Sequence, residues 1–599
     1  MRKEDNKGKF RTAENICGVL MYLISAAMLI FSGYLCFSPD IWYDELFSIQ
    51  FALKPISEMV KLTAADVHPP LYYIIVHVFM RAFSTIGNLV GIDGAAAGAC
   101  TSGPLPVVYA KVASVIPLLI LFIYGITVIR KCYGAFIGGL FSCAMIAMPQ
   151  MADYSVEVRM YSWVMFFITA LCIHAKPFIQ PDKEKQVKGL RFGKMFPIFI
   201  YGLLACYTQY YAAVAVAAVY LFLIVWSVRK NIYQLGIILI SANLTVVCYI
   251  PWIGVVLSQA KSVSSNYWIQ PLSLRSFGGI IKYLMKPGFF NEKLATVLAV
   301  LMFALVAFVV LANLRDAYMW LCFMPLIGII AFGFAASYLL RPIFTYRYMI
   351  PGMGALWLGV LVGAVTGVNK KNGENLKKSL SENNGENLKK SLNENNGENL
   401  KKSLAENDGE NLKKSLSENN IGNINKFFSE RLVKGAQAWG FLLLSALMIV
   451  FGIRDFWAFR GNELYKRVNM EKVVELLSDD YENTVIICNF DQVSALSLYY
   501  FNEMSDITLE NGKAAQVPVY LYGAMTDAYL ETIIPGIGVI DKPADVRQLI
   551  NSGKRVLFLG SFNSREDIVR EWKETEGIDN ENTGSYLLER YWIDVFELS

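Results

Sequence analysis

The feature that most constrains this chain is a series of apolar blocks, each near the roughly 20 residues that cross a bilayer core as a helix. Ile16–Phe37, Leu235–Leu257 and Leu294–Leu314 are three of them. The chain has 599 residues, a mean hydropathy of +0.39 and 18% charged residues, whereas soluble domains carry roughly 25%. These values exclude a collagen, a disordered chain and a secreted disulfide scaffold. They predict an α-helical polytopic membrane protein.

The other candidate membrane helices meet the same criterion, and about 11 to 13 transmembrane helices are expected in all. They are Leu71–Phe83, Val107–Ile129, Ala135–Met148, Met160–Ala175, Phe196–Val228, Ala317–Leu340, Met349–Val368 and Gly435–Ile453. Phe196–Val228 is too long for one helix, and we expect a hairpin with its tip at Tyr207–Tyr211. The loop before Leu71 and the loop after Met148 are both expected outside, so the chain must cross the membrane an even number of times between them. The sequence shows three apolar segments there. Either one of them only dips into the membrane, or one crossing is missing from the count.

Basic residues predict the orientation, because cytoplasmic loops are enriched in lysine and arginine. A basic N-terminal segment precedes the first block, and Lys176–Lys194, Arg229-Lys230 and Lys370-Lys371 mark further cytoplasmic segments. We therefore expect a cytoplasmic N-terminus, with the loop Phe37–Leu71 and everything beyond Ile453 outside. The protein is expected in the cell membrane as a multi-pass protein, and its net charge of +5 indicates membrane orientation rather than nucleic-acid binding.

The chain divides into five expected parts. Residues 1–15 form a cytoplasmic N-terminus, 16–368 a transmembrane module, 369–434 a cytoplasmic loop, 435–454 the last transmembrane helix and 455–599 an extracytoplasmic α/β domain. Within the loop, the motif Gly-Glu-Asn-Leu-Lys-Lys-Ser-Leu repeats every 12 residues from Gly373. Such low-complexity sequence is typical of an expanded, disordered loop, and a docking segment is the alternative.

The C-terminal part has the pattern of an α/β domain. Thr484–Cys488, Val517–Leu521 and Arg555–Leu559 are predicted strands, and Gln492–Phe501 and Ser564–Lys573 are predicted helices. This part has neither a glycine-rich phosphate loop nor a nucleophile elbow. We therefore expect the chemistry in the transmembrane module.

The residues best suited to chemistry lie in the first outer loop. It contains Trp42-Tyr43-Asp44-Glu45 and then Asp66-Val67-His68-Pro69-Pro70-Leu71. Two adjacent carboxylates beside apolar sequence at a membrane are costly unless they face a polar site, a metal or a substrate; the alternative is two solvated loop acids. The prolines are a natural helix start, and His68 either binds an anionic phosphate or is simply exposed.

These motifs, in this order, resemble the GT-C superfamily of membrane glycosyltransferases. The resemblance is to the glycosyltransferase family 39-like branch of protein O-mannosyltransferases and aminoarabinose transferases, and it covers about Ile16–Val368. Besides Asp44-Glu45 and Asp66–Leu71, it is carried by the stretches Tyr154–Tyr161, Tyr207–Tyr211 and Arg341–Tyr348. Family members often have histidine where this chain has Gln209. The resemblance implies a GT-C fold with a C-terminal α/β extracytoplasmic domain.

The resemblance also implies a reaction, in which a sugar passes with inversion from a polyprenyl-phosphate carrier to an acceptor outside the cytoplasm. Asp44 would be the base that takes the acceptor's proton, and Glu45 would orient one of the catalytic groups. His68, Arg159 and Arg347 would bind the donor phosphate, whose charge grows as it leaves. The substrate would lie along Tyr43, Asp66, Tyr154, Glu157, Tyr207, Gln209 and Tyr346.

Alternatives stay open for several of these residues. Asp44 and Glu45 could share a divalent cation, Mg²⁺ or Mn²⁺, since carboxylates suit hard cations. Glu157 and Arg159 could form an ordinary surface ion pair. The expected partners are the lipid bilayer, the polyprenyl-phosphate sugar donor and a glycan, lipid or protein acceptor of the cell envelope. A transporter or flippase of lipid-linked sugars is the alternative function, and a polysaccharide polymerase is a second one.

Overall fold

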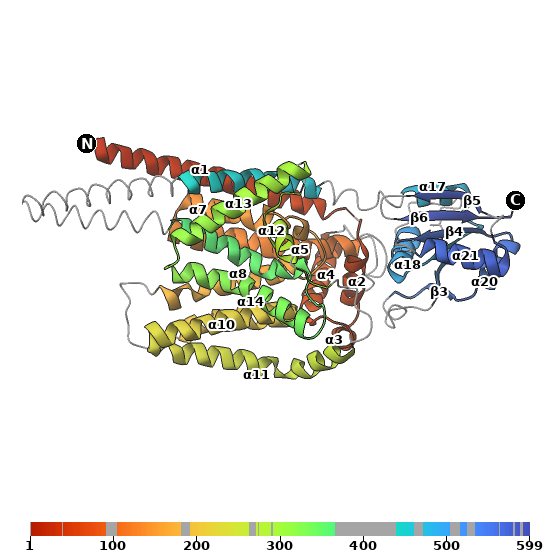
Figure 1. The fold of residues 1–599 in the computed structure, drawn as a ribbon, viewed down its shortest axis with the longest axis horizontal. Coiled ribbons are helices and arrows are strands. Elements are labelled where there is room, and N and C mark those ends of the chain that lie inside the picture. Colours follow the sequence, from red (N-terminus) through yellow and green to blue (C-terminus); the bar gives the residue numbers. More distant parts are fainter. Residues whose placement is uncertain are drawn as a thin grey trace, which may run out of the picture.

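A computed structural model gives the architecture in Figure 1: a long helical bundle with a small α/β domain at one end. It describes residues 2–38, 40–90, 105–180, 192–262, 271–273, 275–288, 291–365, 439–460, 471–503, 516–523, 534–561, 564–578, 582–587 and 591–598. The repeat array that begins at Gly373 lies outside the described residues. The predicted fold class, a helical polytopic membrane protein with a C-terminal α/β domain, is confirmed.

Nine helices in the described part of the chain are long and apolar enough to cross a membrane. They are Glu14–Leu35 in α1 (Arg2–Leu35), Pro106–Tyr133 across α5 (Leu105–Tyr124), η1 (Gly125–Ile129) and α6 (Arg130–Tyr133), α8 (Tyr161–Ile179), α10 (Tyr210–Lys230), Ile232–Ala260 in α11 (Ile232–Ser262), α13 (Glu292–Ala312), α14 (Ala317–Leu339), Tyr346–Val365 and Trp439–Arg460. The last of these continues beyond the expected end at residue 454. Two shorter helices, α7 (Ala135–Ala147) and α9 (Phe192–Thr208), also belong to the bundle.

Helices α1 and α7 run side by side in the same direction. Gly18 of α1 lies against Ala135 of α7, and Gly139 lies against Met21 one turn further along both helices. Glycines at such a crossing let two backbones approach closely. Both helices therefore run toward the same end of the bundle, which we call the outer end, where α1 leads into the segment before Asp44.

Helix α4 (Leu71–Val90) stays at the outer end of the bundle. Its Phe79 ring packs on Trp163 at 6.1 Å between ring centroids, and its Phe83 ring packs on Tyr109 at 5.9 Å. Tyr109 is close along α5 to Lys111, whose ammonium binds the carbonyl of Ser38 just beyond the end of α1. The expectation that Leu71–Phe83 crosses the membrane is therefore wrong. Without that crossing, the number of crossings between α1 and α8 becomes even.

The hairpin predicted over Phe196–Val228 is confirmed. The Tyr220 hydroxyl donates to the carbonyl of Ile198 at 3.2 Å, and Gly202 faces Tyr220 and Val216, so α9 and α10 run antiparallel. Gln209 alone separates the two helices, with an extended backbone. The turn is tight because the carbonyl of Gln209 already accepts the first backbone hydrogen bonds of α10.

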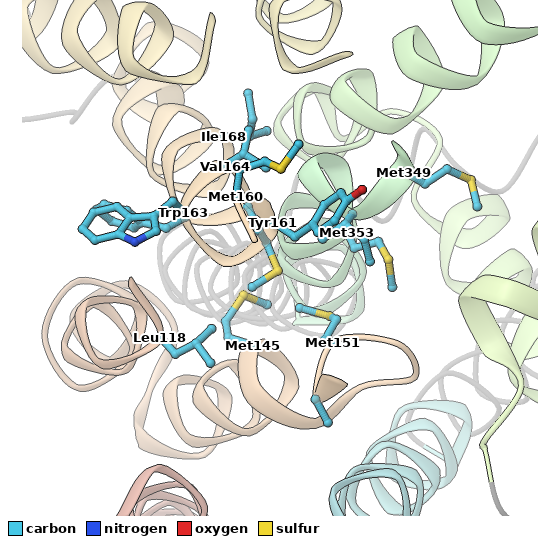
Figure 2. Close-up of a cluster of buried hydrophobic side chains, with 14 of the residues drawn as sticks. Leu118, Met145, Met151, Met160, Tyr161, Trp163, Val164, Ile168, Met349 and Met353 are labelled. Carbon is cyan, nitrogen blue, oxygen red and sulfur yellow. The ribbon is translucent and has the colours of Figure 1, made fainter. Parts of the chain in front are cut away.

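Methionines fill much of the core beside the outer loops. Met145 of α7, Met160 before α8, and Met349 and Met353 of the span Tyr346–Val365 are all buried. Figure 2 shows Met145 near Met160 on one side of Tyr161, with Met353 and Met349 on its other side, toward which the Tyr161 hydroxyl points. Flexible thioethers fill irregular gaps, so they pack these three elements together even though their helices meet at different angles.

The C-terminal domain is built on one mixed sheet with the strand order β3-β2-β1-β4-β6-β5. Strands β1 (Thr484–Cys488), β2 (Val519–Tyr522), β3 (Ile537–Ile540) and β4 (Arg555–Gly560) pair in parallel. Strand β6 (Trp592–Phe596) pairs antiparallel with β4 on one side and with β5 (Asn582–Leu587) on the other. Its helices are α17 (Glu471–Asp479), α18 (Asp491–Leu498), α20 (Pro543–Asn551) and α21 (Arg565–Glu576). The three predicted strands are thus confirmed as β1, β2 and β4.

The outer end carries two short helices, α2 (Tyr43–Leu53) and α3 (Ile56–Ala65), and the separate helix α12 (Arg275–Met285). The C-terminal domain sits at this same end, and its helix α18 packs against α2. Figure 1 shows the N-terminus at the opposite end of the bundle. If the bundle spans a membrane, the N-terminus and the C-terminal domain therefore lie on opposite sides.

We predict that the outer end faces out of the cell. In a background without Cys100 and the exposed Cys17 and Cys132, an impermeant thiol reagent added to intact cells should label Arg570→Cys, at a side chain 60% exposed in the C-terminal domain. The same reagent should label Ser403→Cys in the repeat array only after the cells are opened. The reverse pattern would mean that the predicted orientation is inverted.

Candidate active site

Asp44 lies in the first turn of α2. Trp42 is extended and precedes the helix, and Glu45 reaches back to accept its backbone N–H at 3.2 Å. This is the return hydrogen bond of a capping box, which satisfies a donor that the helix leaves unpaired. Acidic side chains are also favoured near the positive end of the helix dipole. The sequence Trp-Tyr-Asp-Glu therefore starts a helix and presents the Asp44 carboxylate at its outer end.

Two arginines from distant parts of the chain converge on Asp44. Its Oδ2 is 3.5 Å from Nη2 of Arg159, in the loop between α7 and α8, and 3.3 Å from Nη1 of Arg347, at the start of the span Tyr346–Val365. The side chains are 18%, 5% and 28% exposed for Asp44, Arg159 and Arg347. One carboxylate faces two guanidinium groups, so this cluster carries a net positive charge. We call these three residues the Asp44 cluster.

Arg159 is the most enclosed member of the cluster. Its Nη1 donates to the Asp44 carbonyl and to the Ser48 hydroxyl, each at 3.4 Å, and the Ser48 hydroxyl donates to that same carbonyl at 2.7 Å. Burial is the largest single effect on the pKa of Arg159 and works to lower it, but Asp44 acting together with Tyr73, Tyr161 and Glu157 raises the pKa above its usual range. The guanidinium therefore stays charged, and the surface ion pair considered for Arg159 and Glu157 is wrong for so buried an arginine.

Glu45 connects two outer loops instead of facing the Asp44 carboxylate. One of its oxygens accepts the Trp42 N–H, and the other accepts the Val158 N–H at 3.0 Å. Glu45 is fully buried, and it holds the loop of Arg159 against α2. Each of these oxygens thus already binds a backbone amide, and a divalent cation shared by Asp44 and Glu45 stays a prediction. The described residues also contain no group of three or more His, Cys, Asp and Glu side chains that could hold a metal.

Asp66 and His68 form a pair just before α4. The Nδ1 of His68 is 2.9 Å from Oδ2 of Asp66, and both side chains are about one-fifth exposed. Asp66 interacts electrostatically with Tyr73 of α4, which in turn interacts with Asp44 and Arg159. The carboxylate therefore fixes the orientation of the imidazole, and the pair adjoins the Asp44 cluster through Tyr73.

Aromatic rings cover the other side of the cluster. Tyr154, in the short helix η2 (Asp153–Ser155), lies 4.6 Å from the Tyr161 ring, and its hydroxyl is 3.5 Å from that of Tyr283 in α12. Burial raises the pKa of Tyr154 well above its usual value, so its hydroxyl stays protonated. The Tyr346 ring stacks on Tyr283 at 6.0 Å. These four tyrosines surround the start of the span that carries Arg347.

The hairpin tip places Gln209 between the same groups. Its neighbour Tyr210 interacts electrostatically with Asp66, while Tyr211 stacks at 4.7 Å on Tyr348, which interacts with Tyr161. The Gln209 side chain is 4% exposed. Among the described residues, both atoms of its amide and the hydroxyls of Tyr73 and Tyr161 are buried without a hydrogen-bond partner.

Unpartnered buried polar atoms are costly and rare in folded proteins. Here Tyr73 and Tyr161 both interact electrostatically with Arg159 of the Asp44 cluster, and Gln209 lies in the hairpin tip beside Tyr211, which stacks on Tyr348. Sequence reasoning nominated Gln209 but not the two tyrosines, nor Ser48. The tyrosines were missed because a tyrosine beside an apolar run looks like an ordinary residue of the membrane interface.

Three of the nominated residues lie elsewhere or take other contacts. The Tyr207 hydroxyl donates to the carbonyl of Cys248 at 2.8 Å and its ring packs on Tyr249, so its side chain faces α11. Tyr43 packs on Phe47 within α2. The carbonyl of Glu157 accepts the Arg159 N–H at 2.7 Å, while its carboxylate interacts electrostatically with Arg159 and Tyr161 and so stays beside the Asp44 cluster. The structure therefore does not bring Tyr207 into the Asp44 cluster.

No protein-family model matches the sequence, and no curated protein matches it. Among solved structures, the chain is similar to the aminoarabinose transferase ArnT from Cupriavidus metallidurans in the apo state, at 12% identity and a TM-score of 0.49 over 96% of this chain and 97% of that one.

Two archaeal structures are similar as well. An oligosaccharyltransferase of Archaeoglobus fulgidus tethered to an acceptor peptide matches at 10% identity and a TM-score of 0.38, over 94% of this chain and 72% of that one. AglB from the same organism, in complex with an inhibitory peptide and a dolichol-phosphate, matches at 10% identity and a TM-score of 0.35, with the same coverage.

Proposed function

We propose that this protein is a membrane glycosyltransferase that moves a sugar from a polyprenyl-phosphate carrier to an extracytoplasmic acceptor, with inversion. The observation that carries the proposal is the Asp44 cluster, in which one carboxylate is held between two enclosed guanidinium groups at the outer end of a membrane bundle. The two guanidinium groups suit a lipid-borne anionic leaving group, and the carboxylate suits the base that an incoming hydroxyl requires.

Asp44 is the proposed base. Attack on the anomeric carbon requires that the acceptor hydroxyl lose its proton, and a carboxylate within hydrogen-bond reach can take it. The Asp44 carbonyl is held by Arg159 and Ser48, so the backbone of the residue is fixed on two sides. A rigid base is useful because small errors in its position cost a large part of the rate.

Arg159 and Arg347 are the proposed phosphate ligands. As the bond between the anomeric carbon and the phosphate oxygen breaks, negative charge grows on the phosphate. Two guanidinium groups already in place stabilise that charge without reorganising, and their planar donors match phosphate oxygens. His68 stands nearby through Asp66 and Tyr73 and is a third proposed donor. No step in this mechanism uses a metal.

The sugar itself is the proposed partner of the unpartnered polar atoms. The amide of Gln209 and the hydroxyls of Tyr73 and Tyr161 can both donate and accept hydrogen bonds, as can the hydroxyl groups of a sugar. The tyrosine rings of Tyr154, Tyr283 and Tyr346 offer flat apolar surfaces beside them. Such a mixture of rings and polar tips suits a polyhydroxylated ring better than a fatty chain.

The experiment that tests this proposal separates transfer from transport. Purified protein in liposomes is given a polyprenyl-phosphate sugar labelled in the sugar, and both the carrier and the label are followed. A transferase releases free polyprenyl phosphate and moves the label to an acceptor in a membrane extract of the source cell. A flippase moves the intact labelled lipid between leaflets, and that result would replace our proposal.

A further inference from the structure

The segment between α1 and α2 is held by two residues that the proposed mechanism does not use. Lys111 of α5 is fully buried, and its ammonium donates to the carbonyls of Ser38 and Asp40 at 2.8 and 2.7 Å. A buried ammonium is costly unless it is well hydrogen-bonded. The two backbone carbonyls therefore stabilise the buried ammonium, and the ammonium in turn fixes the backbone at Ser38 and Asp40.

The second residue comes from the C-terminal domain. The Tyr500 hydroxyl accepts the Ile41 N–H at 2.9 Å and donates to the Ile41 carbonyl at 2.5 Å. One hydroxyl thus satisfies both backbone groups of a residue 459 positions away. Both residues are buried, at 3% exposure for Tyr500 and 2% for Ile41.

The local structure around Tyr500 is unusual. It lies in η6 (Tyr499–Glu503), a π-helical turn that continues α18, and π-helical turns are frequent at functional sites. Helix α18 packs against α2. The side chain therefore reaches the membrane module close to where α18 packs against the helix of Asp44.

We propose that Lys111 and Tyr500 are positioning residues for Asp44, and that docking of the C-terminal domain is a step in assembling the active site. Lys111 fixes the backbone at Ser38 and Asp40, Tyr500 fixes it at Ile41, and α2 begins at Tyr43. Asp44 follows directly, so the position of its carboxylate depends on the position of this segment. A shift of about 1 Å in a catalytic group can cost about a hundredfold in rate.

The test compares Tyr500→Phe with Tyr522→Phe. The control loses a tyrosine hydroxyl that binds Glu571 of α21 within the C-terminal domain, where the Tyr522 ring packs on Trp572 of the same helix. Because the inference rests on the proposed function, we measure hydrogen exchange of the peptide over residues 36–47 beside turnover. In Tyr500→Phe this peptide should exchange at least tenfold faster and kcat should fall at least tenfold, with KM for the donor within about twofold of the native value.

A second pair tests the other contact. Lys111→Met should speed exchange in the same peptide, whereas Lys554→Met, which removes an ammonium bound to the Glu482 carbonyl, should not. If Lys111→Met fails to fold, the Tyr500 pair still decides. Faster exchange with unchanged kcat, or reduced kcat with unchanged exchange, would overturn the inference. Faster exchange in a protein that shows no transfer of any kind would uphold the contact and reject the proposed function.

Discussion

Asp44→Asn is expected to abolish sugar transfer while leaving donor binding in place. The amide keeps the size of the side chain but cannot take a proton from the acceptor, and the loss of a general base typically costs about 10² to 10⁴-fold in rate. Arg159 and Arg347 remain to bind the phosphate. Release of polyprenyl phosphate from a labelled donor, measured in membranes that carry equal amounts of each protein, gives the rate.

The matched control for this change is Glu58→Gln. Glu58 of α3 is an outer-end carboxylate that pairs at 3.8 Å with Lys54, the C-cap residue of α2, so its amide variant also breaks an ion pair, away from the Asp44 cluster. It should retain turnover. Native turnover in Asp44→Asn would remove the base from the mechanism and, with it, the main reason to prefer a transferase over a carrier of the same lipid.

The Asp44 variant should also be less stable than the control. Removing one partner of a fully buried ion pair costs about 3–5 kcal/mol, and exposed pairs are worth about 0–1 kcal/mol. Asp44 is 18% exposed and Arg347 28%, so we expect a loss between these limits. Donor binding must therefore be measured at a temperature where both variants are folded.

Arg347→Ala is expected to weaken donor binding and turnover together. A hydrogen bond to a charged group contributes about 1.5–3 kcal/mol, which corresponds to roughly tenfold to a hundredfold in affinity. Turnover should fall further, because the phosphate gains charge in the transition state and the guanidinium stabilises that charge more than the ground state. Binding of a spin-labelled or fluorescent polyprenyl phosphate measures the first effect, and kcat measures the second.

Arg341→Ala is the control for this second change. Arg341 stands in the same outer segment, but its guanidinium donates to the carbonyl of Ala260 at 3.0 Å. Its loss should leave the donor affinity within about twofold, as a surface substitution away from the site usually does. Equal losses in Arg341→Ala and Arg347→Ala would mean that the outer segment is held as a whole and that Arg347 has no separate role at the phosphate.

The sequence predicted the membrane helices well because their length is dictated by a physical thickness. It predicted the sheet strands β1, β2 and β4 for a similar reason, since short apolar runs between polar stretches have few other uses. The prediction failed for α4 because composition cannot distinguish a helix that crosses a membrane from one that packs on the outer end of the helical bundle. Phe79 and Phe83 decide the matter, and both need a partner from α5 or α8.

The candidate site was also predictable only in part. Asp44, Arg159 and Arg347 could be nominated because charged residues beside apolar runs are costly and therefore conspicuous. What they do to one another was not predictable, because Arg347 is 303 positions from Asp44. The direction of the Glu45 carboxylate was equally hidden, since adjacent residues on a helix point to different sides. Only the fold shows that Glu45 binds the Val158 amide.

The tether from Tyr500 to Ile41 has a consequence for how the molecule is made. Synthesis proceeds from the N-terminus and domains tend to fold in that order, so α2 and Asp44 leave the ribosome early. Arg159 follows, Arg347 comes much later, and Tyr500 emerges after all the described membrane spans are complete. Until Arg347 is made, the carboxylate therefore lacks one of its two cationic partners, and until Tyr500 is made the segment at Ile41 lacks its anchor. If the proposed function holds, a nascent chain has no complete active site until Tyr500 has been made and the C-terminal domain can dock.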